Sequence, residues 1–224
     1  MVNRKKTVVS PAVTRIFGLI EKQARSFARP WVSSQYGVGN PFRVLISCII
    51  SLRTKEVVTA AASARLFRVA ANARLLAKIP EARIARLIYP AGFYRTKAKT
   101  IRAVSGRLVR EFCGTVPYSL NELLSFPGVG RKTANLVRGV GFAIPAICVD
   151  VHVHRVSNRL GWVKTRKPFE TEEALMRIFD RRYWIGLNDV LVTFGQNICV
   201  PVSPFCSRCM VSRYCKRVGV TRSR

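Results

Sequence analysis

Apolar residues recur at a helical spacing along most of the chain, and this pattern limits the possible fold more than any other feature. Over residues 13–27 and 101–112, apolar side chains return every three or four positions, so they would lie on one face of a helix. Prolines mostly fall between such segments, where they end or begin helices. No stretch alternates apolar and polar residues ahead of a hairpin turn. The sequence therefore predicts an all-α fold of about ten helices joined by short turns.

Charge is the second constraint. The chain has 224 residues, and 49% of them are hydrophobic, which is enough for the core of one large domain or two small ones. Lys and Arg number 39 against 11 Asp and Glu, so the formal net charge is +28. Such an excess repels itself unless a polyanion shares it. We therefore expect nucleic acid to be the partner.

A basic chain could instead bind an anionic membrane, and the sequence argues against that. The longest apolar stretch, residues 44–52, is interrupted by serine and cysteine and is far shorter than the roughly 20 residues of a membrane span. The basic N-terminus is not followed by the apolar segment of a signal peptide. We expect no membrane association and a cytoplasmic, nucleoid-associated location. The basic ends, residues 1–6 and the tail after Cys215, are expected to be frayed and solvated.

Cysteines are unevenly distributed. Of seven, three are scattered, and four crowd together in a C-x6-C-x2-C-x5-C pattern made by Cys199, Cys206, Cys209 and Cys215. An odd, clustered set is unlike a disulfide framework and favours a reducing compartment and a metal site. Four thiolates can hold Zn²⁺ or an iron–sulfur cluster. The spacing favours the cluster because only Cys206 and Cys209 form a short zinc-type pair, but it leaves zinc open.

A glycine-rich turn stands between two helical patterns, in residues 126–134. Gly128 and Gly130 permit a tight turn that tolerates left-handed backbone, and the helical pattern resumes at Arg131. Such a turn points backbone N–H groups at whatever approaches the next helix, and a phosphate fits there. Gly-x-Gly alone is a weak signal, since plain helical corners share it. The spacing and the lack of an upstream strand exclude a nucleotide-binding loop.

Two residues near this turn could carry chemistry. Lys132 lies at a helix N-terminus beside Arg131, where the ammonium form is disfavoured, so some neutral and nucleophilic amine is expected. Its alternative role is a plain phosphate contact. Asp150 precedes a helical pattern, so a helix N-cap is its default role. It could also take a proton or stabilise positive charge if it faces an amine.

Taken together, these signals resemble the endonuclease III branch of the helix–hairpin–helix DNA glycosylases. The resemblance runs through residues 45–54, 92–98, the turn at 127–134, residues 149–152 and the cysteine segment. It implies a base excision enzyme that flips a damaged base out of double-stranded DNA. It also implies two helical lobes. The central helical domain would span 32–146, and 1–31 with 147–224 would form the cluster lobe.

The resemblance also implies residue roles. Lys132 falls on the family's nucleophile, which attacks C1′ of the sugar, forms a Schiff base and leads to strand nicking by β-elimination. Asp150 falls on the catalytic aspartate, and the four cysteines fall on the ligands of a [4Fe–4S] cluster. Monofunctional relatives lack the lysine, so a bifunctional glycosylase and abasic-site lyase acting on oxidised pyrimidines is expected. The alternatives are a monofunctional or mismatch-directed glycosylase and a non-catalytic DNA-binding module.

DNA contacts follow from the same resemblance. The turn residues Gly128, Val129, Gly130 and Arg131 would contact the DNA backbone. Arg53 stands where many members carry a glutamine that fills the gap left by the extruded base, and Glu56 replaces the usual aspartate. An arginine can also enter a base stack, so Arg53 is expected to contact DNA. Two arginines in the cysteine segment, Arg208 and Arg213, would face phosphates, and the protein is expected to be a monomer.

Overall fold

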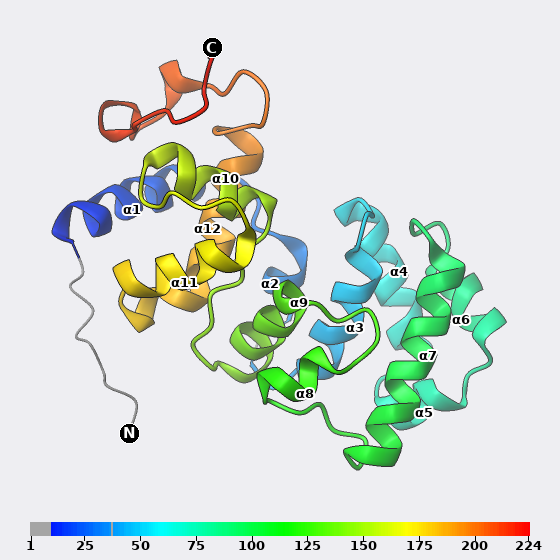
Figure 1. Ribbon diagram of the computed structural model, residues 1–224. Coiled ribbons are helices and arrows are strands. Elements are labelled where there is room, and N and C mark those ends of the chain that lie inside the picture. The colour runs from blue at the N-terminus through cyan, green and yellow to red at the C-terminus, as the bar shows by residue number, and fades with distance from the viewer. Residues whose placement is uncertain (1–9, 37) are drawn as a thin grey trace, which may run out of the picture. The chain divides into compact units, whose positions relative to one another are not determined.

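The computed structural model describes residues 10–36 and 38–224, and these residues form helices and connecting loops with no β-strand (Figure 1). The predicted all-α fold is confirmed. The basic residues 1–6 lie outside the described part of the chain. The chain divides into two compact units, one of them the central segment Trp31–Ile144 and the other the residues up to Pro30 together with Pro145–Arg224. Each unit is described by itself below.

The central unit contains α2 to α9 and a short π-helix, η1. Their bounds are α2 Trp31–Gln35, α3 Pro41–Ser51, α4 Glu56–Val69, α5 Ala73–Lys78, α6 Glu81–Ile88, α7 Tyr94–Glu111, α8 Leu120–Leu124, α9 Arg131–Leu136 and η1 Val137–Gly141. Helix α3 packs against α2, α4, α7, α9 and η1. It is buried continuously from Val44 to Ile50 because it has neighbours on all sides. This helix is the apolar centre of the unit.

Helix α7 is amphipathic, as the spacing over residues 101–112 predicts. Ile101, Val104 and Leu108 are fully buried, and Phe112 at the helix end packs against the same core. Its opposite face is exposed and carries basic residues such as Lys99 and Arg102. Figure 1 shows α5 and α6 beside α7, in agreement with the packing of the three helices. The stripe of apolar residues thus places α7 between its neighbours and solvent.

The other unit is built around α12 (Trp184–Asn197), which packs against α1 (Pro11–Ala24) and α10 (Val151–Leu160). Helix α11 (Pro168–Ile178) packs against α10. Three single-turn 3-10 helices, η2 Arg181–Tyr183, η3 Cys206–Arg208 and η4 Ser212–Tyr214, complete it. The predicted apolar stripe of residues 13–27 buries Phe17, Ile20 and Ala24. Phe17 meets Phe179 edge to face at 5.4 Å, so α1 closes this core.

The C-terminal tail is docked, so the expectation of a frayed end was wrong for its last residue. The Arg224 amide donates a hydrogen bond to the carbonyl of Pro204 at 2.8 Å, and the Ser207 amide donates to the Arg224 carbonyl at 2.9 Å. The Arg224 guanidinium lies over the Phe205 ring at 4.1 Å. These contacts hold the tail because they pair backbone groups and place a cation on an aromatic face. Among the described residues, no helix is long and apolar enough to cross a bilayer.

Candidate functional site

The glycine turn joins α8 to α9, and its two glycines, Gly128 and Gly130, have different backbone conformations and surroundings. Gly128 has a φ of +73°, and a Cβ placed on it would lie 2.9 Å from Cγ2 of Thr100 on α7. Both the backbone and the close approach therefore require glycine there. Gly130 has an ordinary φ of −94° as the N-cap of α9, and a Cβ on it would meet nothing within 4 Å. The left-handed conformation allowed by the sequence is used by Gly128 alone of the two.

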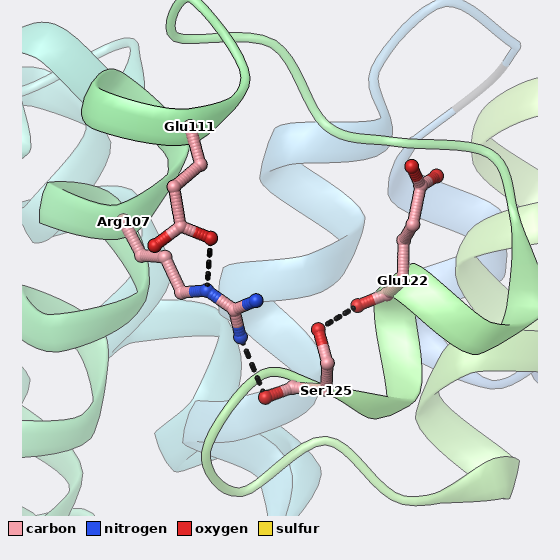
Figure 2. Close-up of polar contacts among 4 residues, drawn as sticks. All are labelled: Arg107, Glu111, Glu122 and Ser125. Atoms are coloured by element: carbon pink, nitrogen blue, oxygen red, sulfur yellow. Dashed lines mark hydrogen bonds and ion pairs between the residues drawn. The ribbon is translucent and has the colours of Figure 1, made fainter.

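A polar clamp holds the start of this turn against α7 (Figure 2). Nε of Arg107 donates to the Glu111 carboxylate at 2.6 Å, and Nη1 donates to the Ser125 carbonyl at 2.6 Å. The same guanidinium lies 4.8 Å from the centre of the Phe126 ring. Ser125 in turn donates to the Glu122 carbonyl at 2.6 Å and closes the end of α8. The turn is thus fixed at Gly128 by packing and at Ser125 by hydrogen bonds.

Lys132 is the second residue of α9 and is exposed. Its positive charge lies near the thiol of Cys48 on α3 within the same unit. Burial raises the pKa of the Cys48 thiol to about 12, and the charge of Lys132 lowers it only in part. Cys48 is therefore a neutral neighbour at physiological pH. Lys132 is thus an exposed residue whose charge acts on the buried helix α3.

Arg53 lies in the short loop between α3 and α4 and has left-handed backbone, with a φ of +51°. Its guanidinium is 5.7 Å from the centre of the Phe93 ring, and Phe93 is also left-handed, with a φ of +55°. Non-glycine residues in this region are uncommon and carry a conformational cost. Arg53 and Phe93 are both exposed. The structure thus presents a cation and an aromatic ring together at the surface.

These segments surround one open cavity of about 420 Å³ in the central unit. Its lining combines the end of α3, the Arg53 loop, the first turns of α7 and the glycine turn, through Ile49, Leu52, Arg53, Phe93, Thr96, Lys97, Thr100 and Gly128. Residues 45–54, 92–98 and 127–134, which carry the family resemblance, are far apart in sequence, and all three contribute to the lining of this cavity. Concave surfaces of this kind are where ligands usually bind.

Asp150 caps helix α10, as its position predicts. Its Oδ1 accepts hydrogen bonds from the amides of His152 and Val153, both at 2.9 Å. The residues before it are buried, and Asn188 donates to the Cys148 carbonyl at 3.0 Å. The Asp150 carboxylate is half-buried and fixed in direction by this cap. Lys132 and Asp150 belong to different units, and each has its position defined within its own.

The four clustered cysteines line one small cavity of about 20 Å³ after α12. None of the four is in a disulfide, and all are half-buried. Burial is the main cause that raises the pKa of the thiols of Cys209, to about 11, and of Cys215, and the charges of neighbouring cysteines raise both further. Bringing thiolates together in this way is unfavourable without a cation to share their charge.

The donor set of this segment consists of four sulfurs, the ligand atoms of structural zinc sites and of iron–sulfur clusters. Among the described residues, no three His, Cys, Asp or Glu side chains converge closely enough to hold one metal ion. The four sulfurs instead stand around a space that protein atoms leave unfilled. Hydrogen bonds support the surrounding loop: Arg159 donates to the Cys199 sulfur at 3.5 Å, and the Arg217 amide donates to the Cys215 sulfur at 3.4 Å. An iron–sulfur cluster takes four thiolate ligands, so the residues present fit such a group.

Sequence reasoning assigned no role to Lys97, a residue of the cavity lining. Its side chain is 6% exposed, and its Nζ donates to three oxygens of the segment that carries Arg53. The signal was present, since Lys97 continues the buried spacing of Ile101, Val104 and Leu108 by one turn. A lysine on an apolar stripe is normally assigned to the surface, which is why the pattern alone does not find it.

Comparison with known proteins agrees with these features. Residues 46–181 match the family model of the HhH-GPD superfamily base excision DNA repair proteins. Endonuclease III of Thermotoga maritima is 46% identical over 198 residues, which are 88% of this chain and 92% of that protein. A solved structure of a trapped endonuclease III–DNA covalent intermediate, an estranged-adenine complex, superposes with a TM-score of 0.82 at 30% identity, covering 92% of this chain and 95% of that one.

A second solved structure, of a non-covalent endonuclease III–DNA complex, has a TM-score of 0.78 at 31% identity, with 91% of this chain and 95% of that chain covered. The family match spans most of the chain and contains the cavity, the glycine turn, Lys132 and Asp150. The cysteine segment follows the matched range. The chain therefore belongs to the HhH-GPD superfamily of base excision DNA repair proteins, and it is a DNA glycosylase and abasic-site lyase of the endonuclease III branch.

Proposed function

We propose that the chain excises oxidised pyrimidines from double-stranded DNA and nicks the resulting abasic site, with Lys132 as the nucleophile. One observation carries this assignment: an exposed lysine is the second residue of the helix that follows the Gly128 turn, in a chain of the endonuclease III branch. A related protein has been trapped as a covalent intermediate with DNA, which requires a protein nucleophile. The exposed amine of Lys132 is the group in this part of the chain that can supply it.

The reaction proceeds in two stages. The neutral amine of Lys132 attacks C1′, and the bond between C1′ and the base breaks as the base leaves with a proton. The bond between C1′ and O4′ then breaks as O4′ takes up a proton, which opens the sugar ring and gives an iminium ion, the Schiff base. Loss of a proton from C2′ breaks the bond between C3′ and the 3′ phosphate, which leaves as the phosphate end of the nicked strand. Water finally releases the lysine from the sugar fragment.

Asp150 is proposed to accept the proton of the attacking amine and to stabilise the positive charge that develops on the sugar. The cap geometry supports this role because two amide donors fix the direction of the carboxylate. The half-buried position supports it as well, since a carboxylate acts more strongly on a nearby charge where water is partly excluded. The same side chain would then serve both helix α10 and the chemistry.

The proposed DNA contacts combine the turn and the Arg53 loop. Gly128, Gly130 and Arg131 are exposed, whereas the Val129 side chain is buried at 6% exposure, so Val129 would contribute through its backbone. Arg53 would enter the duplex beside the cavity. We propose that a monomer binds through two lobes, the central helical domain at 32–146 and the cluster lobe at 1–31 with 147–224. Binding should weaken steeply with salt because a net charge of +28 releases many counterions.

A [4Fe–4S] cluster is the proposed occupant of the cysteine segment, held by Cys199, Cys206, Cys209 and Cys215. When bound, it cross-links the four positions of the loop and supplies no group to the base excision itself. The geometry supports it because the four cysteines line one cavity and none is in a disulfide, and bound iron would stabilise the thiolate form that partial burial disfavours. The exposed arginines of the loop, Arg208 and Arg213, are then available to phosphates.

Borohydride trapping tests the nucleophile. The wild-type protein should form a covalent adduct with duplex DNA that contains one abasic site. Lys132→Gln should abolish the adduct and leave the affinity for the same duplex largely unchanged. Lys78→Gln, which removes an exposed lysine from α5, is the matched control and should trap normally. An adduct of undiminished yield in Lys132→Gln would place the nucleophile elsewhere.

A panel of duplexes tests the substrate. Each carries one modified base and is assayed separately for base release and for nicking. Oxidised pyrimidines should give both products. Base release without nicking would indicate a monofunctional enzyme, and binding without either product would indicate a non-catalytic DNA-binding module.

A further inference from the structure

The buried face of α7 contains an ammonium group whose partners are all on another segment. Lys97 is 6% exposed, and its Nζ donates to the Ile50 carbonyl at 2.6 Å, to the Leu52 carbonyl and to Oγ1 of Thr54 at 2.7 Å. None of these oxygens carries a charge. A buried ammonium normally has a carboxylate partner, because removing its charge from water is costly. Here three hydrogen bonds to residues 50–54 offset the loss of hydration.

Two of these oxygens belong to the end of α3. The helix ends at Ser51 with Leu52 as its C-cap, so Ile50 and Leu52 carry carbonyls that have no partner within the helix. A positive charge near a helix C-terminus is also favoured by the helix dipole. Lys97 therefore caps α3 from a different helix. The cap determines where α3 stops and where the Arg53 loop begins.

The third oxygen anchors the far side of the loop. Oγ1 of Thr54 accepts from Lys97 and also from the Gly92 amide at 3.1 Å. A Cβ on Gly92 would lie 2.6 Å from the Arg53 carbonyl oxygen, so the two backbones are in direct contact. Arg53, at a φ of +51°, is thus held between Leu52 and Thr54, both of which bond Lys97. Backbone in this region persists where the surroundings fix it.

We propose that Lys97 is a positioning residue: it holds the Leu52–Thr54 loop in the conformation that directs Arg53 into DNA. The inference rests on the proposed function in one respect, that Arg53 contacts DNA. Lys97 itself touches neither DNA nor the reacting atoms. It acts on recognition of the damaged duplex and leaves the chemistry of Lys132 intact.

Burial also lowers the pKa of Lys97 to about 8, so the ammonium form with its three donors predominates at neutral pH. A neutral amine would have two donors for the same three oxygens. The hydrogen-bond geometry of the loop thus depends on the charged form. A methionine of similar length would fill the same space and donate to none of them.

A double-mutant cycle separates positioning from plain packing. The variants are Lys97→Met, Arg53→Ala and the two combined, and the measurements are affinity for a duplex with an abasic site and the trapping rate at saturating DNA. Lys97→Met should weaken binding to nearly the same degree as Arg53→Ala, by about tenfold, and the double variant should be no worse than either single one. The trapping rate at saturation should stay within about threefold of wild type.

Two further variants keep the test decisive if Lys97→Met folds poorly. Thr54→Val removes the hydroxyl that accepts hydrogen bonds from both Lys97 and Gly92. Because this change is made in the loop and leaves Lys97 in place, it should weaken DNA binding as Lys97→Met does. Val104→Ala truncates a fully buried residue on the same helix without touching the loop, and it should bind DNA normally. Losses that multiply in the double variant, or an equal loss in Val104→Ala, would overturn the positioning role. Loss of trapping in Lys132→Gln is a separate result and tests only the nucleophile.

Discussion

The loop that carries Arg53 and the segment that carries the four cysteines both follow a largely buried helix, yet different atoms hold them. Residues 52–54 follow α3 and are fixed by a lysine, a threonine hydroxyl and a backbone amide. Residues 199–215 follow α12 and contain only two single-turn helices, η3 and η4. Their four thiols surround a space that no protein atom fills.

This difference concerns where the stabilising partners come from. The Arg53 loop has its hydrogen-bond partners within the chain, so its conformation should be independent of any bound group. The cysteine segment gathers buried thiols whose pKa values are raised by burial and by one another. Such thiols are neutral at physiological pH, and a bound cation would convert them to thiolates and cross-link the segment, so its conformation should depend on the group that it binds. Loss of a metal group should therefore change the cysteine segment and leave the Arg53 loop unchanged.

The largest effect is expected for Cys209→Ser. It removes one proposed cluster ligand, and a structural metal site contributes roughly 10 kcal/mol to the folding of a small metal-binding domain. We expect loss of the yellow-brown colour and of bound iron, and rapid proteolysis within residues 199–215. The central unit should keep its protease resistance. Absorption spectroscopy, iron analysis and limited proteolysis measure these outcomes.

The control for that variant is Cys113→Ser, which changes an exposed cysteine outside the segment and should leave colour and iron unchanged. A colourless wild-type protein with one equivalent of zinc would contradict the cluster assignment. Equal proteolysis of both units in Cys209→Ser would contradict the independence of the Arg53 loop.

Stability at alkaline pH tests whether the Lys97 ammonium that holds the Arg53 loop is buried. The pKa of Lys97 is lowered from 10.5 to about 8, so between these values the unfolded chain binds more protons at this site than the folded chain. The free energy of unfolding of the wild type, minus that of Lys97→Met, should rise as pH increases from 8 to 10.5. Its slope is at most about 1.4 kcal/mol per pH unit. Denaturant titrations at several pH values measure it, and a difference that falls with pH would refute the burial of the charge.

Gly92→Ala tests how tightly this loop is packed. The added methyl group would lie 2.6 Å from the Arg53 carbonyl oxygen, so the backbone must move, at a cost of about 2 kcal/mol. Gly130→Ala is the matched control because its Cβ meets nothing within 4 Å and its φ is ordinary, and it should change the stability by less than about 0.5 kcal/mol. Equal melting temperatures for the two variants would show that the Arg53 loop can move to accommodate the methyl group without loss of stability.

The smallest effect concerns a helix cap in the unit that also contains the cysteine segment. Asp150→Ala should lower the free energy of unfolding by about 1 kcal/mol, because the amides of His152 and Val153 lose their acceptor. Asn72→Ala, which removes the cap of α5 in the central unit, should cost a similar amount. Asp150→Ala should also abolish base excision, whereas Asn72→Ala should not. Normal excision in both variants would leave Asp150 with a structural role alone.

Local features of this protein could be predicted from neighbouring residues. The spacing of Ile101, Val104 and Leu108 predicts a helix and its buried face, and both are present. Asp150 before a helical pattern predicts an N-cap, and Gly128 predicts a left-handed turn. Each depends on groups within a few positions along the chain, which is the range over which hydrogen bonding and backbone sterics are readable in a sequence.

Contacts across the fold could not be read in this way. The burial of Lys97 depends on oxygens of Ile50, Leu52 and Thr54, which are more than forty positions away in sequence. The docking of Arg224 likewise depends on Pro204 and Phe205. The sequence by itself determined the helices, the turn and the cysteine spacing, because these follow from local periodicity and chain geometry. Only the tertiary structure decided which charge is buried and which loop it holds, because that outcome depends on desolvation and on partners that distant segments bring together.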